Sequence, residues 1–213
     1  MVYRKRKFPF VTFTLIFINF ICFFLSILIL STHPNWSWLK EGVCSREIEK
    51  FCFIPAYAFE RPWSFFTSAF LHADFSHLFF NMFSLFLFGI YLESRIGNGK
   101  FLLIYLLSTF FGSLAYFLVS PNSPIPALGA SAAVFGVIGC LAILHPNLLV
   151  WIGFPMPLIL AAIVWGIISF IGIFVPSYIA HHAHLGGLLF GILSGILLRR
   201  KKRRIRVYYY YYY

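Results

Sequence analysis

The sequence predicts an all-α membrane protein: a bundle of six transmembrane helices with both termini in the cytoplasm. Hydrophobic residues make up 61% of the 213 residues and charged residues only 11%, whereas roughly a quarter of the residues of a soluble domain are charged. The stretch from Phe101 to Leu198 contains no Asp, Glu, Lys or Arg, so no soluble fold could cover it with polar surface. Strands with the alternating pattern of a β-barrel are not found, which leaves helices as the expected spanning elements.

Six apolar runs define the expected spans, and polar, proline-rich or glycine-rich segments bound them. In chain order they are Phe8–Leu30, Phe75–Leu92, Phe101–Val119, Ser131–Leu144, Leu148–Ile173 and Ile179–Leu198. The fourth run is near the lower length limit for a span, and Pro155 and Pro157 interrupt the fifth. No periodic repeat and no separable soluble module accompany them, so one compact membrane domain is expected.

The segments between the runs give a reason for each boundary. Residues 31–74 mix prolines, tryptophans and charges and are expected to form a large outer loop, and Glu93–Lys100 is a charged, glycine-rich turn. Prolines occupy three of the positions 120–126, and His145-Pro146-Asn147 breaks the fourth run. Pro176-Ser177 forms the turn before the sixth run. Consecutive runs are therefore expected to cross the membrane in opposite directions.

Basic residues set the orientation of the bundle. They gather in Arg4–Lys7, at Arg95 and Lys100, and in Arg199–Arg206, whereas the basic residues of the loop after the first span are offset by glutamates. The positive-inside rule then places both termini in the cytoplasm. Residues 1–7 are expected as a basic tail, 8–198 as the membrane domain and 199–213 as a basic, tyrosine-rich tail.

The net charge of +11 is explained mostly by this topology and by attraction to anionic lipid head groups. The expected partners are therefore the lipid bilayer and proteins within it, not nucleic acid, and the expected location is the cell membrane. Cys44 and Cys52 both fall in the outer loop, where a disulfide is permitted and two free thiols are equally admissible. Apart from His181, His182 and His184, no group has the spacing of a metal site, and neither a metal nor a cofactor is expected.

Ser131 and His184 are the residues that point to chemistry. Each lies in an apolar segment, where a polar side chain is costly to keep without a function. A hydroxyl and a base that takes its proton are the minimum set for nucleophilic acyl transfer. Spans two, four and six all begin on the outer side, so His77, Ser131 and His184 are expected near the same face of the membrane. His77 and Asn81 are four residues apart and share a helix face.

Small residues offer a way to bring the serine and the histidine together. Gly187, Gly191 and Gly195 follow His184 along one face of the sixth span, and the fourth span carries its own small residues. These are Ala132, Gly136 and Gly139. Glycines at this spacing let two helices approach closely. Contact between the two stripes would bring the Ser131 and His184 ends side by side.

Four motifs, in order, resemble the rhomboid family of intramembrane serine proteases. Residues 66–82 resemble its second-helix signature, Glu93-Ser94-Arg95-Ile96-Gly97 the turn after that helix, Gly129-Ala130-Ser131 its Gly-x-Ser motif and Ala183-His184-Leu185-Gly186-Gly187 its sixth-helix histidine motif. The resemblance runs from Trp63 to about Leu198. It implies a rhomboid-like fold and cleavage of single-span membrane proteins near the outer membrane face.

The resemblance also implies roles. Ser131 is the expected nucleophile and His184 its general base, in a dyad without a carboxylate. His77, Asn81 and the backbone N–H of Ser131 are expected to form the oxyanion hole, and Phe135 to pack on the histidine ring. Gly129 and Gly187 are expected as supporting residues of the two motifs. Span five and the loop 173–180 are expected to gate substrate entry, and the loop after span one to be embedded in the membrane.

The sequence departs from the family pattern at three places. Ala132 follows the nucleophile where glycine is common, Trp63-Ser64 replaces a common Trp-Arg, and Ser68 stands where a histidine or another polar group is frequent. None of these changes removes a chemical group from the dyad. Two alternatives stay open: a catalytically inactive binding protein of the same fold, and a proton-coupled transporter, although the inverted repeat typical of transporters is not found.

Overall fold

A computed structural model describes residues 8–31, 46–151, 153–175, 177 and 179–199. Four helices among these residues are long and apolar enough to cross a membrane. They are α1 (Phe10–Ser31), a continuous helix made of α4 (Phe75–Ser84), the π-helical segment η3 (Leu85–Gly89) and α5 (Ile90–Ile96), then α6 (Asn98–Val119) and α9 (His181–Leu198). Two shorter apolar helices are α7 (Ser131–Leu144) and α8 (Leu158–Gly172). The fold is thus a helical membrane bundle, and the count of six spans stays a prediction.

The expected helix from Leu148 is wrong in its first part. Residues before Leu158 form an antiparallel hairpin of β1 (Leu149–Trp151) and β2 (Pro155–Pro157) instead. Proline cannot donate a hydrogen bond from its backbone nitrogen, and two prolines two residues apart disfavour a helix more than a short edge strand. The helix α8 begins directly after Pro157, which has the extended ψ of 135°. The fifth apolar element is therefore shorter than the sequence suggested.

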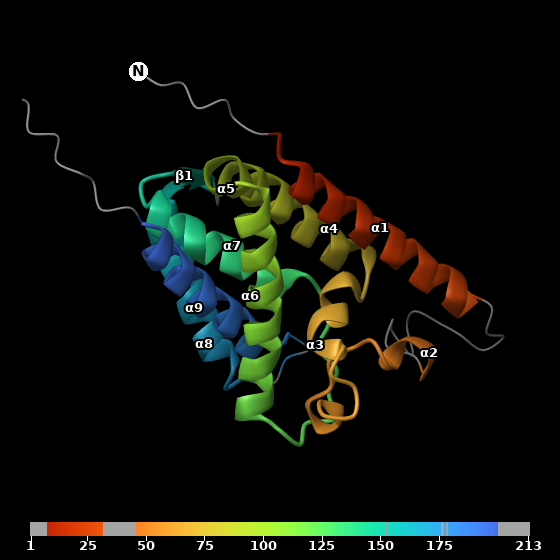
Figure 1. Cartoon of the computed structure of the whole chain (residues 1–213). Coiled ribbons are helices and arrows are strands. Elements are labelled where there is room, and N and C mark those ends of the chain that lie inside the picture. The colour runs from red at the N-terminus through yellow and green to blue at the C-terminus, as the bar shows by residue number, and fades with distance from the viewer. Residues whose placement is uncertain (1–7, 32–45, 152, 176, 178, 200–213) are drawn as a thin grey trace, which may run out of the picture.

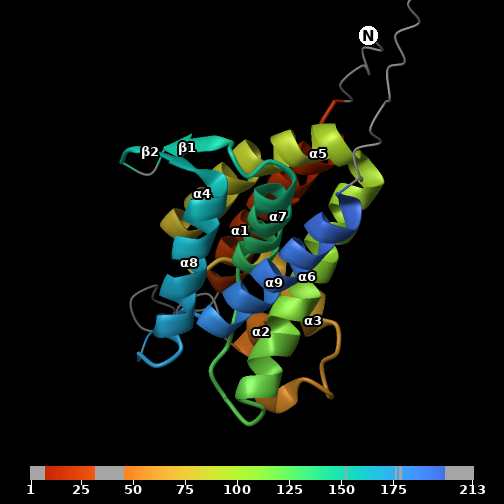
Figure 2. The same ribbon diagram turned by 90° about the vertical axis from the view of Figure 1, so that its left-hand side faces the viewer.

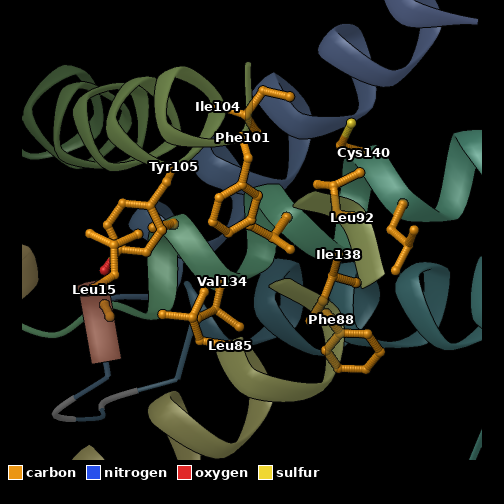
Figure 3. Packing of buried hydrophobic residues seen from close by; sticks show 14 of the residues in the cluster. Leu15, Leu85, Phe88, Leu92, Phe101, Ile104, Tyr105, Val134, Ile138 and Cys140 are labelled. Atoms are coloured by element: carbon orange, nitrogen blue, oxygen red, sulfur yellow. The ribbon is translucent and has the colours of Figure 1, made fainter. Parts of the chain in front are cut away.

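Helix α7 is the centre of the bundle. It contacts α4 and η3 on one side and α6, α8 and α9 on the others (Figures 1 and 2). Every residue from Gly136 to Ala142 is buried. Val134 and Ile138 of α7 meet Leu85 and Phe88 of η3 in the core, with side chains of α6 beside them (Figure 3). A short helix that is apolar all round can be buried in this way.

The outer helices expose apolar side chains, whereas the surface helices of a soluble protein expose polar ones. Large apolar side chains on α1 and α8 are more than half exposed, for example Phe17, Leu28 and Ile168. Hydrocarbon is the medium that suits such a surface. Polar groups turn inward instead, as with the buried Asn19, whose Nδ2 donates to the carbonyl of Leu15 at 2.8 Å. This arrangement agrees with a multi-pass membrane protein.

The expected charged turn from Glu93 is in part helix. Helix α5 continues to Ile96, and the chain turns at Gly97, which has a φ of +87°. Glu93 is not an exposed turn residue, because its side chain is 1% exposed and accepts three hydrogen bonds from the start of α1. Its carboxylate binds the N–H groups of Val11 and Thr12 at 2.9 and 2.7 Å and the Thr12 hydroxyl at 2.6 Å. An acidic side chain at a helix N-terminus satisfies unpaired donors there.

The loop before α4 folds at the end of the bundle away from α5 and the hairpin (Figure 1). It contains α2 (Arg46–Glu49), η1 (Pro55–Tyr57), α3 (Ser64–Thr67) and η2 (Ser68–Phe70). Phe53 exchanges two backbone hydrogen bonds with Ala127, at 3.0 and 2.7 Å. This bridge ties the loop to the segment that leads into α7. Cys52 is buried, and Cys44 lies outside the described residues.

Candidate active site

Ser131 and His184 meet where two helices begin. Ser131 is the first residue of α7, and His184 lies in the first turn of α9. The Nε2 of His184 is 2.8 Å from the Oγ of Ser131. This is hydrogen-bond distance, with the ring nitrogen placed to take the hydroxyl proton. The sequence-predicted pair is therefore brought together.

Close packing of α7 on α9 produces this contact. A Cβ on Gly187 would overlap the carbonyl oxygen of Ala132, and a Cβ on Gly191 would overlap that of Gly136. A Cβ on Gly139 would lie 2.6 Å from the carbonyl oxygen of Leu188. Backbone thus touches backbone along both helices, and the expected contact of the two small-residue stripes is confirmed.

The ring of Phe135 stacks on the imidazole of His184. The ring centroids are 4.4 Å apart and the planes differ by 14°. The ring of His181 also meets that of His184 edge-on, with the two centroids 5.9 Å apart. No Asp or Glu follows Glu93 in the sequence, so no carboxylate from these helices can orient the imidazole. The aromatic face holds the ring in place of an acidic partner.

The backbone at the start of α7 has a conformation that leaves an N–H group at the site without an acceptor among the described residues. Gly129 adopts a φ of +113°, a conformation that favours glycine. Its N–H donates to the carbonyl of Ser68 at 2.9 Å, and the N–H of Ala130 points at Nε2 of His72 at 3.4 Å. Within the described part of the chain, the N–H of Ser131 has no acceptor. It is one of the unpaired donors at a helix N-terminus, where a developing negative charge is stabilised.

His77 and Asn81 border the same site. A Cβ on Gly129 would lie 2.6 Å from Cε1 and Nε2 of His77 and 3.7 Å from Nδ2 of Asn81. The Nδ1 of His77 accepts from the N–H of Ala73 at 3.4 Å. A ring whose Nδ1 accepts a hydrogen bond carries its proton on Nε2, which in His77 is a nitrogen beside Gly129. One amide N–H of Asn81 donates to the carbonyl of His77 at 3.0 Å, and the other N–H is available.

A cavity of about 550 Å³ connects these groups. Its wall contains Ser131, His184, His77 and Asn81, together with Trp165 of α8. Residues 126–128 and 179–180 of two loops also line it, as do further residues of α4 and α7. The volume falls in the range of sites that bind a small molecule or a short peptide segment.

His72 is a site neighbour that the sequence did not assign a role. Its side chain is 0% exposed, and its ring centroid lies 5.1 Å from that of His77. Burial lowers the pKa of His72 to about 3, with a smaller lowering by His77, so the ring is neutral. Its spacing of five residues before His77 was visible, but only the structure shows that it meets the backbone of Ala130.

The other two histidines of α9 make no hydrogen bond to Ser131 among the described residues, although the ring of His181 also meets that of His184. The ring of His182 stacks on Tyr116 at 5.4 Å, with 15° between the planes. A Cβ on Gly172 would lie 2.5 Å from the ring of His181, so that ring fills a notch at the end of α8. Both histidines line a second cavity of about 350 Å³ beside the first. Neither replaces His184 as the base that contacts Ser131.

Comparison with known proteins gives a family match and several relatives. Residues 60–201 match the family model of the rhomboid domain. The chain is 32% identical over 163 residues to Rhomboid protein 1, mitochondrial, of Saccharomyces cerevisiae, covering 71% of this chain and 46% of that protein. It is 37% identical over 141 residues to Rhomboid protease GluP of Bacillus subtilis, covering 64% of this chain and 26% of that protein.

A third relative is named as inactive. It is Inactive RHOMBOID-like protein 8 of Arabidopsis thaliana, which is 37% identical over 130 residues, covering 60% of this chain and 35% of that protein. The chain therefore spans between a quarter and a half of the length of these three relatives. Similarity at this level joins proteases and an inactive protein, so it does not decide activity.

Proposed function

The chain belongs to the rhomboid family, and on that premise we propose that it is an intramembrane serine endopeptidase. Ser131 is the nucleophile and His184 the general base. The observation that carries this proposal is the 2.8 Å contact between Nε2 of His184 and Oγ of Ser131. An inactive relative can keep the fold, but this pair supplies the groups that acyl transfer needs.

The mechanism follows from the geometry. His184 takes the proton of Ser131 as Oγ attacks the scissile carbonyl carbon, and the carbonyl oxygen becomes an oxyanion. The N–H of Ser131, Nε2–H of His77 and the available amide N–H of Asn81 donate to that oxyanion. His184 then gives its proton to the leaving amine, which leaves an acyl group on Ser131. A water molecule attacks the acyl carbon by the same base catalysis and frees the enzyme.

The surroundings of Ser131 support a substrate with small side chains. Gly129, Ala130 and Ala132 flank the nucleophile, and the cavity is lined mainly by apolar groups. A peptide bond within a helix has its carbonyl occupied, so the substrate must unwind locally before attack. We therefore assign single-span membrane proteins, cut at small residues in a segment of weak helix propensity, as the substrate class.

The proposed topology places six helices across the membrane with both termini in the cytoplasm. Residues 8–198 form the membrane domain between the two basic tails, and residues 31–74 form a loop embedded at the outer face. Trp165 of α8 and residues 179–180 line the cavity, which supports the role of this side as the substrate gate. The cell membrane is the proposed location, although relatives include proteins named as mitochondrial.

An activity-based probe tests the function directly. A fluorophosphonate should label the purified protein at Ser131, and Ser131→Ala should remove the label without loss of folding. Ser76→Ala is the matched control, because Ser76 is an exposed serine of α4 with no hydrogen-bonded histidine among the described residues. An unlabelled but folded wild-type protein would favour the inactive alternative, which is the second candidate function that a relative supports.

A further inference from the structure

The β1–β2 hairpin has no role in the proposed catalytic mechanism. Its strands pair Leu149 with Pro157, Val150 with Met156 and Trp151 with Pro155. It joins the end of α7 to the start of α8, so it lies at the end of the bundle opposite Ser131 (Figure 2). Two backbone hydrogen bonds hold its base together. The N–H of Leu158 donates to the carbonyl of Leu148 at 2.8 Å, and the N–H of Ile159 donates to the carbonyl of Pro146 at 3.2 Å.

The hairpin has two different faces. Val150 packs against the main hydrophobic core. The neighbouring Leu149 and Trp151 point to the other face and are 66% and 75% exposed, and Phe154 near the turn is 54% exposed. No residue from Phe101 to Leu198 carries a charge. An apolar patch without charges is a poor surface for bulk water.

The lengths of the adjoining helices limit how far the hairpin can extend from the bilayer. Helix α7 has 14 residues and α8 has 15, which gives lengths of about 21 and 22 Å at ~1.5 Å per residue. The hydrocarbon core of a bilayer is ~30 Å thick. The link between two helices shorter than the core therefore lies close to the boundary between hydrocarbon and head groups.

We propose that this hairpin is a membrane-interface anchor, with Leu149, Trp151 and Phe154 inserted at the level of the lipid head groups. Tryptophan suits this level because its ring is apolar and its indole N–H finds a polar partner. Pro155 and Pro157 have no backbone N–H, so β2 exposes fewer unpaired donors, which would be costly in an apolar environment.

Charge at the same end of the bundle selects the lipid. Arg95 lies in the last turn of α5, Lys100 lies in the first turn of α6, and Arg199 follows α9. These cations attract the anionic head groups of lipids. The hairpin thus inserts apolar side chains into the bilayer next to the cations that contact the lipid head groups. The anchor holds the N-terminal end of α8, and this role does not depend on the protein being an active protease.

Tryptophan fluorescence tests the anchor. The protein has five tryptophans, and replacing Trp36, Trp38, Trp63 and Trp165 by Phe leaves Trp151 as the single reporter. The variant is reconstituted in vesicles of phosphatidylcholine and phosphatidylglycerol, with bromine placed either high or low on the acyl chains. Because tryptophan prefers the interface, we expect about twofold stronger quenching by the high bromines than by the low ones. Iodide in the buffer should quench Trp151 less than free N-acetyltryptophanamide.

The opposite pattern would overturn the anchor. If iodide quenches Trp151 as well as the free amide while neither brominated lipid has an effect, the patch faces water or a soluble protein. If the low bromines quench more than the high ones, the hairpin lies inside the hydrocarbon instead. Should the four-fold variant fail to fold, the same contrasts are read from the difference between the wild-type protein and Trp151→Phe, since Trp151 is exposed and its loss removes no core contact.

Discussion

The Nε2 of His184 lies 2.8 Å from the Oγ of Ser131, although the two residues are 53 positions apart in the sequence. What joins them is the close approach of Gly187, one turn after His184, to the carbonyl oxygen of Ala132, the residue after Ser131. Chemistry and packing are therefore linked along one pair of helices. Variants of the dyad and variants of the packed glycines should therefore have separable effects on turnover and on stability.

Removing either member of the dyad should abolish turnover of a membrane-spanning substrate. Ser131→Ala and His184→Ala should each lose nearly all activity, and the double variant should be little worse, because residues that act as a unit have non-additive effects. Initial rates in detergent, with melting temperatures as the folding check, measure this. Appreciable turnover by folded Ser131→Ala would sink the assignment.

The oxyanion donors should show a smaller and separable effect. His77→Ala or Asn81→Ala should lower the turnover number by about a hundredfold, as the loss of one oxyanion-hole donor typically does. Both side chains line the cavity with Ser131. If Asn81 serves only its bond to the His77 carbonyl, the melting temperature would fall while the folded fraction kept its turnover number.

Gly187→Ala should damage the protein without touching a reacting group. Its Cβ would overlap the carbonyl oxygen of Ala132, and forcing the helices apart should cost about 3 kcal/mol or more in the free energy of unfolding. The separation would also lengthen the contact between Ser131 and His184. Gly99→Ala is the matched control, because a Cβ there meets nothing within 4 Å. Equal stability of the two variants would contradict the packing argument.

His72 should make stability fall in mild acid. Its pKa is about 3 in the folded protein and 6.5 ordinarily, so below pH 6.5 the unfolded chain takes up a proton that the folded chain does not. The free energy of unfolding should decrease by up to about 1.4 kcal/mol per pH unit, or by about 1.6 kcal/mol between pH 6.5 and about pH 5, because the unfolded residue is already half protonated at pH 6.5. More than about one pH unit above the ordinary pKa, both states are neutral at this residue and the contribution is constant.

The comparison with His72→Gln isolates that residue. Glutamine keeps an acceptor for the N–H of Ala130 but does not titrate, so its stability curve should be flatter by about one proton over the same range. Denaturant unfolding in mild detergent at several pH values supplies both curves. His77 and Asp74, which also face His72, are present in both proteins and cancel. Parallel curves would show that His72 is not the source.

Substrate choice should follow helix strength and side-chain size. A model single-span substrate with glycine near the site and alanine at it should be cut faster than one with an uninterrupted leucine-rich helix and phenylalanine at the site. Local unwinding is cheaper in the first, and the small residues around Ser131 leave little room for a ring. Rates measured in one detergent for a matched set of substrates decide this, and equal rates would refute it.

Much of the site was predictable because it rests on local patterns. The spacing of Gly187 and Gly191 after His184 indicates a helix face, and the same rule relates Asn81 to His77. The hairpin was not predictable in this way, since a short apolar run such as 148–157 has no periodicity that separates strand from helix. Its two prolines are compatible both with a break in a helix and with a short edge strand.

Glu93 shows a second limit of the sequence. Beside Ser94, Arg95 and Gly97 it has the composition of an exposed turn. It is buried because its partners, Val11 and Thr12, come from a helix more than 80 residues earlier in the chain. Likewise, the contact of His72 with Ala130 spans 58 positions. Such pairings depend on how the helices assemble, and no local pattern encodes them.

The stacking of Phe135 on His184 has an electrical consequence. The imidazole is oriented by an aromatic ring and not by a carboxylate, so at rest the dyad holds no net charge in the membrane. On the proposed mechanism, the proton moves between two atoms that are 2.8 Å apart, so its displacement is less than a tenth of the ~30 Å core. A potential of 100 mV acts on a full crossing with about 2.3 kcal/mol per charge and so on this step with at most about 0.2 kcal/mol, less than thermal energy. Proteolysis at this site should therefore proceed equally well in energised and de-energised membranes.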